Sequence, residues 1–474
     1  MANPTHVTVI GAGPGGYPAA FLAADLGMQV TLVDEEKNPG GVCVYRGCIP
    51  SKALLHVAKV LDEARHASQF GVEFAAPTVN LDKLRGFKDG VVSKMTSGTG
   101  VLTRSRKIRY VQGRATITSP TSVSVALTAG GEERITFDVG ILATGSRPAT
   151  LPNLTISADR VLDSTSALEL KSVPKSLLVI GGGYIGLELG SVYAALGTKV
   201  SVVEMLPGLL PGADRDLVKI LAERIGQICE TVMLSTKVAK MADDPSGGVK
   251  VNFEHGDGTT SEKVYEKVLV SIGRRPNGQV PGLDTTKVVV DPKGFIQVDA
   301  QRRTAEPTLY AIGDVAGEPM LAHKATYEAK IAVEAIAGHK VAYEPRAIPA
   351  VVFTDPELAW CGLTEQEAQR DNIPHEVAKF PWGASGRATS IGRTDGLTKI
   401  LFDPKTERVL GVGIVGAGAG EMIAEGTLAV EMAAVATDLA MTIHAHPTLS
   451  ETMMESAEGF FGHATHVFRP KRKG

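Results

Sequence analysis

One glycine-rich unit occurs twice in this 474-residue chain, and the repeat constrains the fold more than any other feature. In the first copy an apolar run leads into Gly11, Gly13 and Gly16, and a second apolar run ends at the acid Asp34. The second copy has the same order of elements. Its glycines are Gly181, Gly183 and Gly186, and its closing acid is Glu204. A strand, a glycine turn, a helix and a second strand begin a parallel α/β sheet. The chain is therefore predicted to contain two α/β domains of one kind.

The glycine pattern also has a chemical reason. Glycines at these positions let a pyrophosphate approach the helix N-terminus, where free N–H groups favour negative charge. An acid about 20 residues further on accepts hydrogen bonds from an adenosine ribose, and Asp34 and Glu204 stand there. Two unrelated glycine turns are the alternative, but each copy follows a strand and opens a helix. Two bound dinucleotides are therefore predicted. No Lys or Arg occurs in residues 205–210, which favours NAD over NADP at the second site.

A second repeat indicates where these domains close. Ala143-Thr144-Gly145-Ser-Arg-Pro is echoed by Ser-Ile-Gly273-Arg274-Arg-Pro, each well downstream of its own glycine turn. The chain is too long for one hydrophobic core, and after about residue 345 strand-like runs alternate with helices. We therefore predict an α/β fold with two Rossmann-like domains, a central domain and a C-terminal α+β domain. The predicted ranges are 1–148, 149–276, 277–345 and 346–474.

Composition and charge exclude several classes of function. The formal net charge of −3 gives no reason to expect nucleic acid or an anionic membrane as partner. No apolar stretch has the length that spans a bilayer, and the N-terminus does not resemble a signal peptide. We therefore predict a cytoplasmic location. Four cysteines do not make a disulfide scaffold, and no metal site is predicted.

Two of the four cysteines, Cys43 and Cys48, lie five positions apart. In a reducing compartment such a pair is more often catalytic than structural. Residues five apart point away from each other in a regular helix, so Gly47 would have to break the helix if the two sulfurs meet. Cys48 would then begin the helix that carries Lys52, where the dipole favours a thiolate. Two ordinary buried cysteines remain the alternative from spacing alone.

The segment Gly-Gly41-Val-Cys43-x4-Cys48-Ile-Pro-Ser-Lys52 resembles the active-site segment of the pyridine nucleotide–disulfide oxidoreductases. The resemblance extends over essentially the whole chain, through Gly313-Asp314, residues 320–324 and the motif at 444–451. Within the family it is greatest to the members that oxidise dihydrolipoamide. It implies FAD in the first Rossmann-like domain, NAD in the second, and a homodimer formed through the C-terminal domain.

The resemblance also implies a reaction. Protein-bound dihydrolipoamide reduces a Cys43–Cys48 disulfide, and the electrons pass through FAD to NAD+. His446, oriented by Glu451, takes the thiol proton at the disulfide of the other subunit. Lys52, paired with Glu188, lies near the flavin. The implied FAD contacts are Gly11, Gly13, Gly16, Asp34, Gly41, Lys52, Ala115, Thr144, Gly145, Asp314, Leu321, Ala322 and His323. The implied NAD contacts are Gly181, Gly183, Tyr184, Ile185, Gly186, Glu188, Glu204, Val238, Gly273 and Arg274.

The partners implied are the lipoyl domains and the subunit-binding domain of dihydrolipoyl acyltransferases, and the glycine cleavage H protein. The sequence does not choose between these complexes. The alternatives to this function are another NAD(P)H-linked flavoprotein disulfide reductase and a redox-dead scaffold subunit. Retention of every chemical residue in register argues against the scaffold.

One short segment departs from the family pattern, and one further residue has two possible roles. Val44-Tyr45-Arg46 stands between the cysteines, where the family usually has Leu-Asn-x. Arg46 therefore places a cation three residues from Cys43. It could stabilise a thiolate or meet an anionic substrate, but a place in solvent or a pair with a local acid is favoured. Tyr184 opens the second helix, and two interpretations of it are equally weighted. Its ring either covers the flavin until nicotinamide displaces it, or packs between strand and helix.

Overall fold

The first glycine unit forms the centre of a seven-stranded sheet in the order β17-β6-β1-β2-β3-β4-β5. The computed structural model describes residues 5–151, 156–157, 159–245 and 247–468. The elements of this unit are β1 (His6–Ile10), α1 (Gly16–Asp25), β2 (Gln29–Asp34), β3 (Arg109–Ser119), β4 (Ser122–Leu127), β5 (Glu132–Thr136) and β6 (Val139–Leu142). Strands β1, β2, β3 and β6 are parallel, and β4 and β5 continue the sheet as an antiparallel meander. β1, β2 and β6 are rich in Val, Ile and Leu because both of their faces are largely buried, whereas buried and exposed residues alternate along β3.

A segment from much later in the chain completes this sheet. β17 (Leu309–Ala311) pairs in parallel with β6 at the sheet edge. It leads through η3 (Gly313–Ala316) into α8 (Ala322–Ile336), which packs against α1. Residues on both sides of the second glycine unit thus build the first domain.

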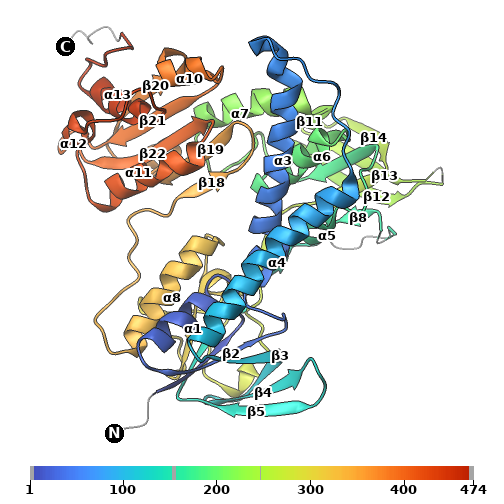
Figure 1. Ribbon diagram of the computed structural model, residues 1–474, viewed down its shortest axis with the longest axis vertical. Helices are drawn as coiled ribbons and strands as arrows, with labels where there is room; N and C mark the ends of the chain where they lie inside the picture. Colours follow the sequence, from blue (N-terminus) through green and yellow to red (C-terminus); the bar gives the residue numbers. More distant parts are fainter. Residues whose placement is uncertain (1–4, 152–155, 158, 246, 469–474) are drawn as a thin grey trace.

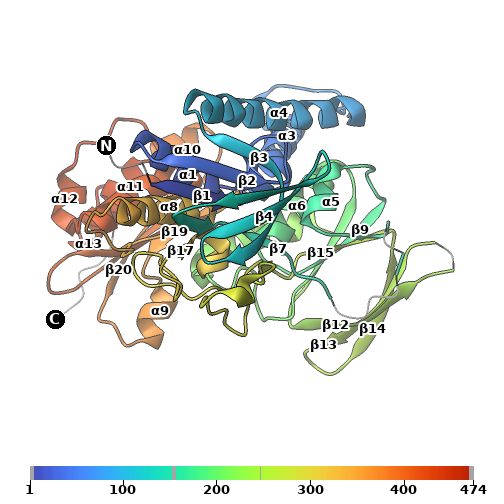
Figure 2. The ribbon, with the colours of Figure 1, turned by 90° about the horizontal axis from the view of Figure 1, so that it is seen from below.

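The second unit forms a parallel sheet in the order β11-β10-β9-β15-β8. Its strands are β8 (Val161–Leu162), β9 (Ser176–Ile180), β10 (Lys199–Val203), β11 (Thr231–Met233) and β15 (Lys267–Val270). Its helices are α5 (Ser164–Glu169), α6 (Tyr184–Ala195) and α7 (Arg215–Ile228). The antiparallel strands β12 (Thr236–Asp243), β13 (Val249–His255) and β14 (Thr260–Tyr265) project from it (Figure 2).

The second sequence repeat joins the two units. β7 (Ser146–Pro148) and β16 (Arg274–Pro276) pair with each other as an antiparallel ribbon, with Arg147 opposite Arg275. The short helix η2 (Leu283–Thr285) then contacts β3.

A helical excursion between β2 and β3 carries the cysteines. It comprises α2 (Gly41–Arg46), α3 (Cys48–His66), η1 (Ala67–Phe70) and α4 (Leu81–Ser105). Figures 1 and 2 show α3 and α4 side by side, and α3 also contacts α6 of the second unit. Among the described residues, no helix combines the length and apolar character needed to cross a membrane.

The C-terminal part is a separate α+β lobe, drawn in orange and red in Figure 1. Its antiparallel sheet has the order β18-β19-β22-β21-β20, with α11 on β19 and β22 and α13 on β20 and β21. The strands are β18 (Ala350–Val352), β19 (Glu357–Gly362), β20 (Glu376–Pro381), β21 (Leu397–Phe402) and β22 (Val409–Gly416). The helices are α9 (Glu365–Arg370), η4 (Trp382–Ala384), α10 (Gly386–Ser390), α11 (Ala419–Glu431), α12 (Ala436–Met441) and α13 (Glu451–Phe460). The predicted fold class is confirmed, whereas the boundaries at 148, 276 and 345 stay predictions.

Candidate active site

A groove crosses the carboxyl ends of β1 and β2, where an open α/β sheet binds its ligands. A cavity of about 390 Å³ is lined by the first glycine loop, both cysteines and the N-terminus of α8. A neighbouring cavity of about 590 Å³ shares Gly11, Asp34 and Thr144 with it and extends to Ala115 on β3. The two cavities therefore form one elongated site of the kind that suits a dinucleotide.

The two cysteines flank a break between two helices. Cys43 lies in α2, Cys48 is the first residue of α3, and Gly47 separates them. A Cβ atom on Gly47 would lie 2.9 Å from the Val42 carbonyl oxygen and 3.2 Å from the Cα atom of Cys43. A glycine at position 47 therefore lets the start of α3 lie close to the backbone of Val42 and Cys43 in α2. This break between the two helices agrees with the distortion that the sequence predicted for residues 43–48.

The two thiols share a hydrogen bond, and their acidities differ. The Cys43 thiol donates to Cys48, which is the largest cause that lowers the pKa of Cys48 to about 7; burial opposes it, and the Lys52 charge assists. The same hydrogen bond raises the pKa of Cys43. When the pair loses one proton, Cys48 is thus the thiolate and Cys43 keeps its proton.

An ion pair lies beside the thiols. The Lys52 ammonium is 2.9 Å from Glu188 Oε2, and the Glu188 side chain is only 4% exposed. The pair joins α3 to α6. Phe353 completes it from the C-terminal lobe, because its N–H donates to Glu188 Oε1 at 3.0 Å and its ring centroid lies 4.3 Å from Lys52 Nζ.

Asp314 follows β17, and a chain of hydrogen bonds connects its carboxylate to Arg274 of the second unit. Ser146 donates to Asp314 Oδ2 at 2.5 Å and accepts from Arg274 Nε at 2.7 Å. Asn277 donates to the Thr144 carbonyl at 3.0 Å and also lines the groove. Arg274 was expected at the NAD site. In the structure it donates a hydrogen bond to Ser146, which in turn donates to Asp314.

The two glycine loops have matching geometry. Gly11, at φ +95°, and Gly181, at φ +107°, each lie where a Cβ would come within 2.5 Å of the carbonyl oxygen of Ala143 or Ser271. Asp34 accepts N–H bonds from Ala12 at 2.6 Å and Glu36 at 2.9 Å.

Glu204 accepts the equivalent bonds from Gly182 at 2.7 Å and Leu206 at 2.8 Å. Both carboxylates are thus fixed with lone pairs left for a ribose. The residues present fit a flavin dinucleotide in the groove and a second dinucleotide at the repeated loop.

His446 and Glu451 form the expected dyad but lie away from the thiols of their own chain. His446 Nδ1 is 2.8 Å from Glu451 Oε1, and the His446 side chain is 76% exposed. Burial raises the pKa of Glu451, but the N–H of Thr448 and the His446 ring outweigh it and leave the pKa lowered. Neither residue lines the cavity that holds the cysteines.

The remaining predicted positions vary in how closely they approach the groove. Gly13, Gly41, Gly145, Tyr184, Ile185 and Ala322 line the cysteine cavity. Gly16 begins α1, Leu321 precedes α8, and exposed His323 contacts the Pro349 carbonyl oxygen at 2.7 Å. Gly183 and Gly186 lie at the start of α6, Gly273 follows β15, and Val238 lies on β12. Gly16, Gly183, Gly186, Val238, Gly273, Leu321 and His323 line none of these cavities.

The structure separates the alternatives for Arg46 and for Tyr184. Arg46 lines the groove, and its guanidinium pairs with Glu36, a local acid as favoured. Tyr184 lines the cysteine cavity with 38% of its surface exposed, so it is not a core residue between strand and helix. Its role as a gate stays a prediction.

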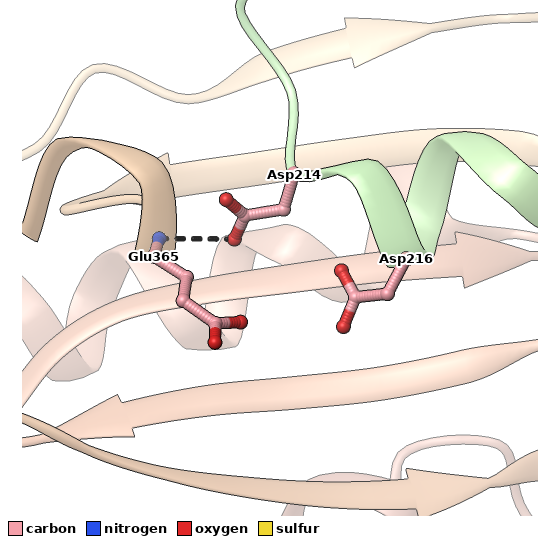
Figure 3. A group of neighbouring side chains, drawn as sticks. All are labelled: Asp214, Asp216 and Glu365. Carbon is pink, nitrogen blue, oxygen red and sulfur yellow. Dashed lines mark hydrogen bonds between the residues drawn. The ribbon is translucent and has the colours of Figure 1, made fainter. Parts of the chain in front are cut away.

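Three carboxylates outside the groove have the spacing of metal ligands. They belong to Asp214, Asp216 and Glu365, and Glu365 donates its N–H to Asp214 (Figure 3). The ammonium of fully buried Lys399 lies 2.8, 3.0 and 2.5 Å from these three acids. The Lys399 ammonium thus offsets the negative charge of the three carboxylates. These ion pairs connect α7 to the C-terminal lobe.

Motif analysis missed Ser146, Asn277 and Phe353. Ser146 and Asn277 stand within or next to the second repeat, so their position could have pointed to them. Nothing in the sequence around Phe353 indicates that this residue reaches the Lys52–Glu188 ion pair.

Comparison with known proteins agrees with this geometry. A family model described as pyridine nucleotide-disulphide oxidoreductase matches residues 5–329, and the dimerisation-domain model matches residues 348–457. The dihydrolipoyl dehydrogenase of Haemophilus influenzae is 47% identical over 469 residues, which cover 99% of this chain and 98% of that protein. That of Vibrio cholerae is 46% identical over 471 residues, with 99% and 98% covered. That of Geobacillus stearothermophilus is 44% identical over 467 residues, with 98% of each covered.

Solved structures are similar over the same length. LpdA from Mycobacterium tuberculosis has a TM-score of 0.88 at 26% identity, covering 96% of this chain and 99% of its own. The HOCl-induced flavoprotein disulfide reductase RclA from Escherichia coli, in its Cu(II) complex, has a TM-score of 0.86 at 26% identity, with the same coverage.

Proposed function

Because the chain belongs to the pyridine nucleotide-disulphide oxidoreductases, and relatives named dihydrolipoyl dehydrogenase match it at 41–47% identity over nearly its full length, we propose that it oxidises dihydrolipoamide with NAD+. The observation that carries the proposal is the hydrogen-bonded pair Cys43–Cys48 beside the Lys52–Glu188 ion pair. These residues share one cavity with the first glycine loop, and that cavity reaches Tyr184 and Ile185, where the second glycine loop enters α6.

The residues of the chain would divide the work as follows. FAD, when bound, supplies a two-electron acceptor between the thiols and NAD+. Asp34, the first glycine loop and Asp314 would hold it, and Glu204 with the second loop would hold the NAD+ ribose. The helix α8 points its N-terminus at the cysteine cavity, where its dipole favours negative charge.

The thiol chemistry would begin on a Cys43–Cys48 disulfide. His446 of the partner subunit takes a proton from one substrate thiol, and Glu451 beside it stabilises the imidazolium. The substrate thiolate attacks the Cys43 sulfur, the Cys43–Cys48 bond breaks, and Cys48 leaves as a thiolate. The sulfur of the second substrate thiol then attacks the sulfur bonded to Cys43, the mixed disulfide breaks, and Cys43 leaves as a thiol with the second proton, so that lipoamide is released. The low pKa of Cys48, about 7, makes it the better leaving group.

A homodimer is part of the proposal, because His446 is exposed and away from the cysteines of its own chain. The matched dimerisation-domain model supports it. Leu428, Met432, Met441 and Ile443 of the C-terminal lobe are 62–96% exposed, as an interface would require. The further partners we propose are the lipoyl and subunit-binding domains of dihydrolipoyl acyltransferases, or the glycine cleavage H protein. A cytoplasmic location suits thiols that must stay reducible.

The test is turnover of the purified protein. The wild type should show an oxidised flavin spectrum and form NADH from dihydrolipoamide and NAD+. Cys43→Ser should keep FAD bound and lose this activity. NADH formation from glutathione but not from dihydrolipoamide would contradict the proposal in favour of another disulfide reductase, and a flavoprotein inactive with both would indicate a scaffold.

A further inference from the structure

Phe353 links three parts of the molecule at the redox centre. It follows β18 in the C-terminal lobe, whereas Lys52 lies on α3 and Glu188 on α6. Its ring faces the Lys52 ammonium at 4.3 Å, and its N–H donates to Glu188 Oε1 at 3.0 Å. Both members of the ion pair are therefore contacted by one residue of the C-terminal lobe.

The two contacts have different physical consequences. Glu188 is almost fully buried, and each of its oxygens has a donor, Lys52 on one and the Phe353 N–H on the other. A buried carboxylate held in this way has one position. Lys52 is freer, because its side chain is 33% exposed and its four-carbon stem is flexible. The Phe353 ring supplies the second contact that restricts the ammonium.

The Lys52 side chain borders a further cavity, into which it could move. Lys52 lines a third cavity, of about 460 Å³, in addition to the cysteine cavity, and Phe353 lines this third cavity only. Lys52 pairs with Glu188, and its charge acts on both Cys43 and Cys48. The charged or titratable groups that line the third cavity with it are His56, Lys59, Asp62, Arg65, Arg224, Asp355 and Glu357. Without the aromatic face, the ammonium could turn toward Asp355 and Glu357 and away from the thiols.

We propose that Phe353 is a positioning residue of the thiol centre, whose ring keeps the Lys52 ammonium beside Glu188 and the Cys48 sulfur. The C-terminal lobe thereby helps to set the charge at the disulfide. This inference rests on the proposed function, because it assumes that Cys48 works as a thiolate next to a flavin.

The experiment compares the reduced holoenzymes of the wild type, two variants of Phe353 and one control variant. Phe353→Leu removes the aromatic face and keeps the backbone N–H, and Phe353→Tyr keeps both. Phe21→Leu is the matched control, since it removes a cation–π contact of 4.7 Å to Arg106 away from these cavities. The measurement is the pH midpoint of the long-wavelength absorption band that a thiolate produces beside oxidised flavin.

The expected result is a midpoint higher by roughly half a pH unit in Phe353→Leu, the size that a partly exposed cation–π contact allows. Phe353→Tyr and Phe21→Leu should keep the wild-type midpoint. Equal midpoints in wild type and Phe353→Leu, or equal shifts in all three variants, would overturn the role of Phe353. If Phe353→Leu does not hold FAD, Phe353→Met is judged by the same comparison. A wild type without any thiolate band would instead overturn the proposed function.

Discussion

The hydrogen bond between Cys43 and Cys48 makes a quantitative prediction about the two sulfurs. It is the largest cause that lowers the pKa of Cys48 from its ordinary value of 9.0 to about 7. Cys43→Ala removes the donor, whereas Cys43→Ser replaces it with a hydroxyl donor in the same place. The two variants therefore differ in one hydrogen bond to a thiolate.

The size of the effect follows from that bond. A hydrogen bond to a charged group contributes about 1.5–3 kcal/mol, which corresponds to about one to two pH units in the midpoint of the Cys48 thiolate. The sign is upward, because the lost donor stabilised the deprotonated form. For a shift of about 1.5 units, the thiolate fraction at pH 7.5 would fall from about three quarters to about a tenth. The Lys52 charge remains in both variants.

The assay is a pH titration of the thiolate band in the two purified flavoproteins. Cys43→Ser should keep a strong band near neutral pH, and Cys43→Ala should show it only at higher pH. Equal midpoints in the two variants would refute the assignment of the hydrogen bond. A band in Cys48→Ser but not in Cys43→Ser would show that the roles of the cysteines are reversed.

Four further outcomes are expected. The like charge of Glu204 and a 2′-phosphate should make kcat/KM for NAD+ exceed that for NADP+ by about 10²–10³-fold; comparable values would contradict this. His446→Gln should slow dihydrolipoamide oxidation by about 10²–10⁴-fold and spare NADH oxidation by artificial acceptors, whereas equal loss of both would indicate misfolding. Tyr184→Ala should bind FAD normally and speed electron leakage to oxygen when NAD+ is absent; an unchanged oxidase rate would speak against a gate. Ile443→Asp should raise the dimer dissociation constant by about 10²–10⁴-fold, since a twofold interface counts each apolar side chain twice, and an unchanged sedimentation profile would place the interface elsewhere.

Local features of the chain were predictable because their causes are local. The glycine loops, their closing acids and the break at Gly47 each depend on a few consecutive residues and on the strand or helix that contains them. The dyad of His446 and Glu451 lies within one short motif. The positions of these features therefore follow from short stretches of the amino-acid sequence.

Long-range features were not predictable in the same way. Phe353 reaches Glu188 across 165 positions, and that contact depends on how β18 docks on the other lobes. The bond from Ser146 to Asp314 spans 168 positions and depends on β17 entering the first sheet. A repeat or a motif specifies an element, but it does not specify which distant element will pack beside it.

β17 belongs to the first sheet but lies about 300 residues after β1 in the chain, and this has a consequence for biosynthesis. The strands of the second sheet lie between residues 161 and 270, so that sheet can form before the ribosome has translated residues 309–311. The first sheet, although it begins at residue 6, must wait for its last parallel strand and for the helix at Ala322–Ile336 that covers it. We therefore expect a nascent chain of about 300 residues to carry a finished second unit on an open first one. Capture of the flavin is then a late step, possible only when the C-terminal lobe is already being made.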